Sequence, residues 1–326
     1  MEKVALVGPY DPAIKERLLQ TIPNEFVIKE ITAESEYDQL ADVHYIILRT
    51  LHLKEAAIQF IPGLKLIQRW GVGYDSVDIK AAGARNIPVA VTSGMNAPSV
   101  SELAVLLMLA VYRKLPLLHN NVLAGKWRGE SGIASSSYVI EGKTVGLIGL
   151  GAIGRQVVQK VNAFGATVQY YDPFRLSADE EAKWKVRYAT LEELLKTSDI
   201  ISLHLPLTEK TRHLICRQTI ELMKPTAIIV NTARGEIIKE ADLVTALQDG
   251  RILGAGLDVV EREPLAAGNP LLGLNNVVLT PHMGGSTFDI NVSMVQRCIE
   301  NIVKISRGES LRPGDFVNAR YFSKHK

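Results

Sequence analysis

The chain has few cysteines and no long apolar run, and each shortage excludes a class of protein. Its 326 residues include two cysteines, Cys216 and Cys298, which are far apart and outside any Cys/His cluster. We therefore expect neither a disulfide framework nor a metal site. The apolar run from Leu103 to Val111 is too short to span a bilayer and is flanked by charged residues. We expect a protein that does not act in a membrane.

The chain also has no large excess of positive or negative charge. Its 37 Lys and Arg residues nearly balance its 35 Asp and Glu residues, which leaves a net charge of +2. We interpret the basic end, residues 324–326, as a solvated terminus rather than a nucleic-acid patch. The amino terminus, MEKVALVG, begins directly with strand-like residues and lacks the layout of a signal peptide. These features favour a cytoplasmic globular protein, long enough for two domains, that does not bind nucleic acid.

The most informative stretch runs from Thr144 to Asp172. It contains an apolar strand, a glycine turn, an amphipathic helix and a second strand that ends on a carboxylate. The glycines Gly149, Gly151 and Gly154 have the spacing G-x-G-x-x-G. In this pattern the first glycine permits a tight turn, the second lets the backbone approach a pyrophosphate, and the third lets the helix pack on its strand. The helix N-terminus would face the diphosphate.

The carboxylate of Asp172 lies at the usual distance beyond the glycines. It would accept hydrogen bonds from both ribose hydroxyls and repel a 2′-phosphate, so we predict NAD rather than NADP as the cofactor. Arg175 is close enough in sequence to weaken that preference. A glycine turn alone is a weak signal, since such turns also serve packing. Here strand, turn, helix, strand and acid occur in order, which favours nucleotide binding.

Strand-like and helix-like segments alternate on both sides of this stretch, which predicts α/β domains with parallel sheets. Before it, we expect strands at residues 4–8, 26–32, 45–49, 64–70 and 89–93, and helices at 13–20, 54–60 and 76–85. After it, we expect strands at residues 199–205, 226–232, 254–259 and 276–280, and helices at 191–196, 217–223 and 240–247.

Two further helices are expected to connect the domains. The segment from Asn96 to Lys114 is almost continuously apolar, as in a helix buried on most sides. Ser99 and Glu102 match an S-x-x-E capping box at its start. A last long helix, residues 288–306, would cross back, so that the carboxy-terminal tail completes the amino-terminal domain.

Three polar residues follow expected strands of the second half. They are Arg234 in NTARGE, Glu263 in LDVVEREP and His282 in TPHMGG. Hydride transfer between a nicotinamide and a carbonyl needs a proton donor, a cation that holds a carboxylate, and a group that orients the donor. His282 is the candidate acid/base, Arg234 can bind a carboxylate bidentately, and Glu263 would hold the other ring nitrogen. Each residue also has an ordinary structural explanation, but their joint occurrence at strand ends favours catalysis.

The first half lacks a G-x-G-x-x-G turn but has Gly71-Val72-Gly73 after an expected strand. The backbone N–H groups of such a turn can form an anion-binding nest. From the residues alone, this interpretation and an ordinary turn are equally open. Arg49 and Arg69 could meet a substrate phosphate, although Arg49 could equally be a salt-bridged strand end.

Taken together, GVGYDSVD, GLGAIG, HLPLT, NTARG, LDVVEREP and PHMGG resemble the D-isomer-specific 2-hydroxyacid dehydrogenase family over essentially the whole chain. The resemblance implies a Rossmann NAD-binding domain, residues 99–287. This domain would be inserted into a flavodoxin-like substrate domain made of residues 1–98 and 288–326. The resemblance also implies a homodimer, with a cleft between the domains that closes on the ligand.

The resemblance assigns roles to residues by motif. Arg234, Glu263 and His282 become the catalytic set, with His282 the acid in reduction and the base in oxidation. The turn from Gly71 to Gly73 would grip the substrate carboxylate through its backbone amides. The remaining positions would contact the cofactor: Ile153 and Arg155 the diphosphate, Asp172 the adenosine ribose, His204, Pro206 and Thr211 the adenine side, and Thr232, Ala233 and Asp258 the nicotinamide end.

The main prediction is an NAD-dependent enzyme that reversibly reduces a small 2-oxo acid, such as pyruvate, hydroxypyruvate or glyoxylate, to the D-2-hydroxy acid. Formate is disfavoured, because formate dehydrogenases of this fold carry Gln where the chain has Glu263. Two alternatives stay open: an NAD(H)-sensing corepressor or scaffold, and a dehydrogenase of the same fold that oxidises phosphite. The sequence leaves open the preferred 2-oxo acid, the physiological direction and the strictness of NAD over NADP.

Overall fold

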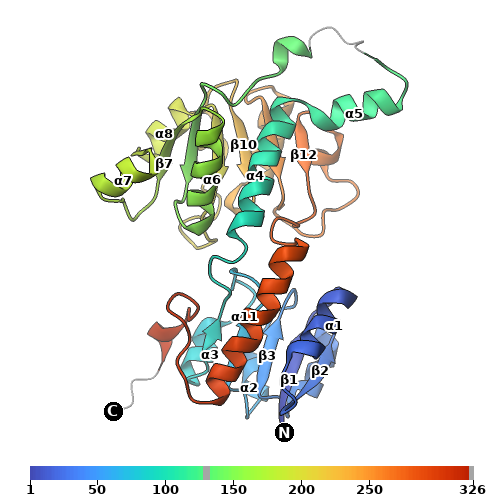
Figure 1. Cartoon of the computed structure of the whole chain (residues 1–326). Helices are drawn as coiled ribbons and strands as arrows, with labels where there is room; N and C mark the ends of the chain where they lie inside the picture. Colours follow the sequence, from blue (N-terminus) through green and yellow to red (C-terminus); the bar gives the residue numbers. More distant parts are fainter. Residues whose placement is uncertain (128–132, 323–326) are drawn as a thin grey trace. The chain divides into compact units, whose positions relative to one another are not determined.

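The computed structural model describes residues 1–127 and 133–322, which form two compact α/β units (Figure 1). The first unit comprises Met1–Asn96 and Ser286–Lys326, and the second comprises Ala97–Gly285. Each boundary between the two units lies two residues before the domain boundary expected from the sequence. The difference at the first boundary arises because helix α4 already begins at Ala97.

The described part of the first unit contains a parallel five-stranded sheet in the order β2-β1-β3-β4-β5. This is the flavodoxin-like order, which reverses direction between β1 and β3. The strands are β1 Glu2–Val7, β2 Phe26–Ile31, β3 Tyr45–Leu48, β4 Leu66–Arg69 and β5 Val89–Ala90. The helices are α1 Pro12–Thr21, α2 Glu55–Phe60, α3 Ile79–Ala84 and α11 Phe288–Ser306, with 3-10 turns at Glu34–Leu40 and Ala319–Tyr321.

Alternate residues of β1 show how this sheet buries both faces. Val4 and Leu6 belong to the apolar cluster that contains the buried faces of α1 and α11, and these helices pack on each other (Figure 1). Ala5 and Val7 belong to the opposite cluster, with α2 and α3. The two-residue period of a strand therefore serves two helical layers, which is why these strands read as continuous apolar runs.

The described part of the second unit contains a parallel seven-stranded sheet in the order β12-β11-β10-β9-β6-β7-β8. This is the Rossmann order with one added strand, and it reverses direction between β6 and β9. The strands are β6 Thr144–Ile148, β7 Thr167–Tyr171, β8 Val186–Tyr188, β9 Ile200–Leu203, β10 Ile228–Asn231, β11 Gly254–Leu257 and β12 Val277–Leu279. The helices are α4 Ala97–Tyr112, α5 Leu115–Leu123, α6 Ala152–Ala163, α7 Ala178–Trp184, α8 Leu191–Thr197, α9 Arg217–Ile220 and α10 Glu240–Gln248, with 3-10 turns at Ala134–Ser136, Gly235–Ile237 and Pro270–Gly273.

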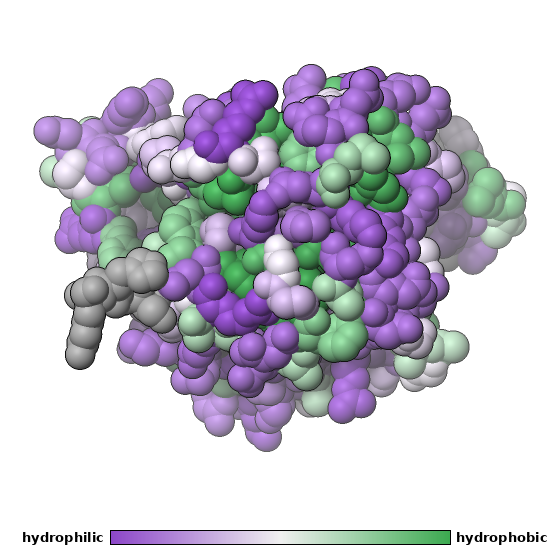
Figure 2. Space-filling model, turned by 90° about the horizontal axis from the view of Figure 1, so that it is seen from below, coloured by the Kyte–Doolittle hydropathy of each residue, from purple (hydrophilic) through white to green (hydrophobic). Residues whose placement is uncertain are grey.

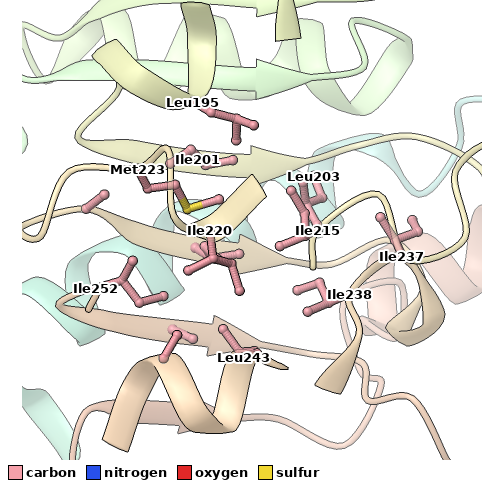
Figure 3. Packing of buried hydrophobic residues seen from close by; sticks show 14 of the residues in the cluster. Leu195, Ile201, Leu203, Ile215, Ile220, Met223, Ile237, Ile238, Leu243 and Ile252 are labelled. Atoms are coloured by element: carbon pink, nitrogen blue, oxygen red, sulfur yellow. The ribbon is translucent and has the colours of Figure 1, made fainter. Parts of the chain in front are cut away.

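Helices cover both faces of this sheet as well. Helices α4 and α6 pack together on one face, where their apolar residues meet those of β6 and β7 (Figure 1). On the other face, Figure 3 shows side chains from α8, α9, α10 and β9 meeting in one cluster. Each fully buried Leu or Ile in it contributes about 1.5–3 kcal/mol to stability. The expected fold class, two parallel α/β domains, is confirmed.

Several local expectations were wrong. Helix α4 begins at Ala97, so Ser99 lies inside its first turn and does not form the predicted capping box. Instead, the Ser99 hydroxyl donates to the Gly284 carbonyl at 2.6 Å. The helix expected at 76–85 begins only at Ile79, because Asp78 caps it by accepting from the amides of Lys80 and Ala81. Helices α5 and α7 and strand β8 were not predicted.

The face drawn in Figure 2 mixes hydrophilic residues with smaller hydrophobic groups. This is the distribution expected of a polar surface over an apolar core. Within residues 1–127 and 133–322, no helix is both long enough and apolar enough to cross a bilayer. Across the same residues, no group of three or more His, Cys, Asp or Glu side chains is arranged to hold a metal ion.

Candidate active site

The three turn glycines have three different surroundings. Gly149 follows β6 with φ +96°, and a β-carbon there would lie 2.3 Å from the carbonyl oxygen of His204. A β-carbon on Gly154 would lie 2.5 Å from the carbonyl oxygen of Gly149. A β-carbon on Gly151 would meet no protein atom within 4 Å. The protein fold therefore requires Gly149 and Gly154, whereas the space at Gly151 suits the close approach of a ligand to the helix N-terminus.

The carboxylate of Asp172 is held beside this turn at the end of β7. Its Oδ2 accepts from the Leu150 amide at 2.9 Å, and its Oδ1 accepts from the Phe174 amide at 2.9 Å. Each carboxylate oxygen can accept a further hydrogen bond. The arrangement fixes the carboxylate beside the turn that follows β6, and β6 borders the reversal point of the sheet, where ligands of doubly wound folds bind.

The residues expected at the diphosphate lie in the first turn of α6. Arg155 donates from Nε to the Leu150 carbonyl at 3.2 Å, and its guanidinium lies 5.6 Å from the ring centre of Trp184. Ile153 is half-buried and packs against the cluster that α4 and α6 share. These contacts hold both residues next to the glycine turn.

Two polar atoms are buried at the carboxyl ends of β9 and β10. Nδ1 of His204 and Oγ1 of Thr232 have no hydrogen-bond partner among the residues that the structure describes. Nε2 of His204 lies 2.8 Å from the Ser202 hydroxyl, and burial lowers the pKa of His204 from 6.5 to about 4, so its ring is neutral near pH 7. Buried polar atoms are normally paired. Both positions therefore suit a ligand that brings polar groups of its own.

The loop after His204 is closed by its own hydroxyls. Thr211 Oγ1 donates to the Pro206 carbonyl at 2.7 Å and accepts from the Thr208 amide at 2.7 Å. Pro206 and Thr211, both expected on the adenine side, are thus parts of one local hydrogen-bonded loop. Whether they contact adenine stays a prediction.

The loop that carries Arg234 is held by a residue that the sequence analysis missed. Asn231, fully buried at the end of β10, donates from Nδ2 to the Arg234 carbonyl at 2.9 Å. Its Oδ1 accepts from the Ala233 amide at 3.0 Å. A β-carbon on Gly235 would lie 1.9 Å from the Val260 carbonyl oxygen, so this loop packs directly on the loop after β11. An Asn at the end of a strand, whose side chain can bond to the backbone two residues on, is the signal that could have identified it.

Asp258 organises the loop that carries His282. It is 2% exposed, and its carboxylate accepts from the Thr280 hydroxyl at 2.6 Å and from the amides of Met283 and Gly284 at 2.9 and 2.8 Å. The His282 amide donates to the Asp258 carbonyl at 2.7 Å, with His282 at φ +56°. The resemblance placed Asp258 at the nicotinamide end, and these contacts add a structural role in positioning His282.

The imidazole of His282 is paired with a carboxylate. Its Nδ1 lies 2.7 Å from Oε2 of Glu263, and the two side chains are 48% and 39% exposed. An ionised carboxylate only accepts hydrogen bonds, so Nδ1 is the donor in this pair. The second nitrogen, Nε2, is then the one that can exchange a proton with a substrate.

The three expected catalytic residues follow three neighbouring strands. Arg234 follows β10, Glu263 follows β11 and His282 follows β12, and these strands pair in parallel. Carboxyl ends of parallel strands meet at one edge of a sheet. The structure thus brings Glu263 and His282 into direct contact and places Arg234 on the adjoining loop.

In the first unit, the edge formed by the carboxyl ends of the strands carries the turn from Gly71 to Gly73. Gly71 has φ +117°, and its carbonyl accepts from the Thr92 amide at 2.9 Å. Because C=O and N–H of one trans peptide point in opposite directions, the Val72 amide points away from Thr92. This turn follows β4, next to the loop after β3 that carries Arg49.

Arg69 supports this turn from inside the unit. It is 8% exposed, and it donates from Nε to the Gly73 carbonyl at 2.8 Å and from Nη1 to the carbonyls of Leu48 and Arg49 at 2.9 and 2.6 Å. These contacts give Arg69 a structural role, and its contact with a substrate phosphate stays a prediction. Its guanidinium joins the loops that follow β3 and β4.

Arg49 contacts backbone and an aromatic ring. Its Nη1 donates to the Pro9 carbonyl, and its guanidinium lies 5.8 Å from the ring centre of Tyr10. Among the described residues, no carboxylate forms an ion pair with Arg49, so it is not the salt-bridged strand end considered above. Its contact with substrate stays a prediction.

Comparison with known proteins identifies the family. A profile described as "D-isomer specific 2-hydroxyacid dehydrogenase, NAD binding domain" matches residues 105–284, more than half of the chain. The chain belongs to the D-isomer specific 2-hydroxyacid dehydrogenase family. The matched range spans the glycine turn, Asp172, Arg234, Glu263 and His282. As a family member, the chain is an NAD-dependent oxidoreductase that acts on the CH–OH group of 2-hydroxy acids, and its second unit is the NAD-binding domain.

Named relatives extend the likeness beyond that domain. A glyoxylate reductase of Korarchaeum cryptofilum is 39% identical over 79% of this chain and 77% of its own length. A hydroxypyruvate reductase of Thermotoga maritima is 40% identical over 90% of this chain and 96% of its own. The crystal structure of a D-lactate dehydrogenase from Aquifex aeolicus, complexed with NAD and lactic acid, is 28% identical, covers 97% of this chain and 99% of its own, and has a TM-score of 0.87. These relatives do not favour a corepressor or a phosphite dehydrogenase.

Proposed function

We propose that this family member reduces a short 2-oxo acid, of the size of glyoxylate, hydroxypyruvate or pyruvate, to its D-2-hydroxy acid with NADH, and catalyses the reverse reaction. The names of the relatives support this range of substrates. The observation that carries the proposed chemistry is the 2.7 Å contact between His282 Nδ1 and Glu263 Oε2, on loops of the NAD-binding domain.

The second unit has the features that NAD requires. The open space at Gly151 admits the diphosphate to the α6 N-terminus, where Ile153 and Arg155 would flank it. Asp172 would accept from the adenosine ribose. The buried atoms of His204 and Thr232 support contacts along the rest of the cofactor: His204, Pro206 and Thr211 on the adenine side, and Thr232, Ala233 and Asp258 toward the nicotinamide. When bound, NADH supplies the hydride.

The chain's own residues move the proton and hold the charge. Glu263 accepts from His282 Nδ1 and keeps the ring in one orientation. His282 Nε2 then gives a proton to the carbonyl oxygen of the 2-oxo acid during reduction, and takes it back during oxidation. Arg234 binds the substrate carboxylate with its planar fork and stabilises negative charge on the reacting oxygen.

The first unit would contribute to substrate binding. The turn from Gly71 to Gly73 follows β4, and its Val72 amide points away from the carbonyl contact with Thr92. Such amides suit a carboxylate. Arg49 follows β3 at the point where the strand order reverses, the usual ligand position in such sheets. We therefore assign the substrate carboxylate to the turn, and a polar group at the far end of longer substrates to Arg49.

The decisive experiment compares two histidines of the second unit that are each paired with a glutamate at 2.7 Å. His282→Ala should lower kcat for a panel of 2-oxo acids by about 100- to 10,000-fold, with the Kd for NADH within about twofold, because the cofactor contacts lie elsewhere. His213 is the matched control, since its Nε2 lies 2.7 Å from Oε1 of Glu261 in the same unit. His213→Ala should keep kcat near the wild-type value. Equal loss of kcat in both variants, or loss of NADH binding with His282→Ala, would contradict the proposal.

We further propose that the enzyme is a cytoplasmic homodimer. Helix α5 supports self-association, because none of its residues is buried and it exposes Leu115, Leu118, Val122 and Leu123 at 53%, 39%, 51% and 73%. Apolar residues grouped in this way are typical of an interface. Both cysteines are unpaired, which suits a reducing compartment. Light scattering that gives the mass of one chain at micromolar concentration would refute the dimer.

A further inference from the structure

The residues after Asp172 bear on the choice between NAD and NADP. The Phe174 amide donates to Asp172 Oδ1 at 2.9 Å, so the chain turns back around the carboxylate directly before Arg175. Arginine is the side chain best suited to a phosphate, because its fork can bind two oxygens. An arginine three residues beyond the ribose-binding carboxylate is therefore a potential partner for a 2′-phosphate.

In this structure Arg175 is engaged by two other residues. Its Nε lies 2.9 Å from Oε1 of Glu181 on α7, and its guanidinium lies 4.9 Å from the ring centre of Tyr188 on β8. The Arg175 side chain is 62% exposed, whereas that of Glu181 is only 14% exposed. Glu181 is therefore the anchored member of the pair, and Arg175 is the member that can be released.

Glu181 is anchored by a buried tyrosine. The Tyr170 hydroxyl donates to Glu181 Oε1 at 3.0 Å and accepts from the Leu176 amide at 2.9 Å. Tyr170 is fully buried and packs edge-on against Tyr188, with ring centres 5.6 Å apart. The carboxylate that holds Arg175 thus belongs to a network connected to the core of the domain, and the hydrogen bond from Arg175 lowers the pKa of Glu181.

We propose that Glu181 is a positioning residue for cofactor specificity. By pairing with Arg175, it keeps the guanidinium neutralised and turned toward α7, so that Asp172 alone meets the ribose and NAD is preferred to NADP. This inference rests on the proposed function only in requiring that the second unit binds NAD. An exposed ion pair is weak, so its release should change the preference severalfold, whereas Asp172 accounts for the larger part.

The test measures the Kd values of NADH and NADPH by fluorescence titration, together with KM and kcat. Glu181→Gln should tighten NADPH binding about 3- to 10-fold relative to NADH, through KM and not through kcat. The effect should be larger in an Asp172→Ser background, where the 2′-phosphate is no longer repelled. It should vanish when Arg175→Ala is added, because the released guanidinium is its cause.

A second ion pair provides a matched control. Arg187 Nη1 lies 2.7 Å from Glu193 Oε1 in the same unit, again six residues apart. Glu193→Gln should leave the ratio of NADPH to NADH affinity unchanged. If Glu181→Gln does not fold, Glu181→Asp is the second variant. Its shorter side chain removes the contact with Arg175 Nε and keeps a negative charge at this position, and it should raise the NADPH to NADH affinity ratio in the same direction.

The outcomes separate this inference from the proposed function. An NADPH to NADH affinity ratio that is unchanged in Glu181→Gln and Glu181→Asp, with NADH binding intact, overturns the inference alone. A change that persists with Arg175→Ala, or that Glu193→Gln reproduces, also overturns it. A wild-type protein that binds neither dinucleotide overturns both. A rise in the ratio that depends on Arg175 supports the inference.

Discussion

Alanine substitutions at two glycines of the β6–α6 turn should separate cofactor binding from folding. At Gly151 the backbone has φ −73°, which alanine adopts without strain, and an added methyl meets no protein atom. Alanine also loses less conformational entropy than glycine on folding, a gain of about 0.4–1 kcal/mol. The apo protein should therefore melt at the wild-type temperature or about 1–4 °C higher.

The same methyl would occupy the space through which a diphosphate reaches the α6 N-terminus. Losing one charge-assisted hydrogen bond costs about 1.5–3 kcal/mol. At about 1.4 kcal/mol per factor of ten, the Kd of Gly151→Ala for NADH should rise about 10- to 150-fold. Fluorescence titration with NADH measures this increase directly.

Gly149→Ala should instead destabilise the apo protein. Its φ of +96° costs an L-residue about 1–2 kcal/mol. A β-carbon 2.3 Å from the His204 carbonyl oxygen adds about 1–3 kcal/mol of overpacking. A total of about 2–5 kcal/mol corresponds to a melting temperature lower by about 4–20 °C for a unit of this size.

Gly268→Ala is the control, since Gly268 is exposed and an added methyl there also meets no atom. It should leave the melting temperature unchanged or raise it by about 1–4 °C, as Gly151→Ala does, and it should leave NADH binding unchanged. Unaltered NADH affinity in Gly151→Ala, or a loss of stability as large as that of Gly149→Ala, would refute the assignment of this turn to the cofactor.

Two further predictions concern residues that the sequence linked only to the cofactor. Asp258→Asn should destabilise the apo protein by about 2 kcal/mol in calorimetry, because an amide cannot accept all three hydrogen bonds of the His282 loop. In turnover and binding assays, kcat should fall more than the affinity for NADH. Equal losses of kcat and NADH affinity would instead assign Asp258 to the nicotinamide. His204 has its pKa lowered to about 4 in the folded state, so the unfolded chain takes up the proton first as the pH falls from 6.5 to 4, and stability is lost across that window. Between pH 7 and pH 4.5, the free energy of unfolding of His204→Gln in urea should therefore fall by about 2 kcal/mol less than that of the wild type. An identical pH dependence of both proteins would show that His204 is not desolvated.

Local patterns were sufficient for most of the fold. The alternation of apolar runs with amphipathic stretches predicted parallel α/β units, and the expected helix at 288–306 coincides with α11. The glycine spacing predicted the turn after β6, because a tight turn and a close helix contact depend on residues a few positions apart. Short polar elements such as α7 escaped detection, since a single exposed helical turn or two carries little hydrophobic periodicity.

Some features of the candidate site were likewise predictable from the sequence, and others required the tertiary structure. The sequence by itself determined which chemical groups follow which strands, and so identified Arg234, Glu263 and His282 as candidates. Only the tertiary structure decided that Asp258 holds the loop of His282 and that Arg69 supports the turn from Gly71 to Gly73. These contacts join strand ends brought together by the order of the sheets, and no pattern of neighbouring residues encodes that order. Chemical identity is local to the chain, whereas the partner of each side chain depends on long-range packing.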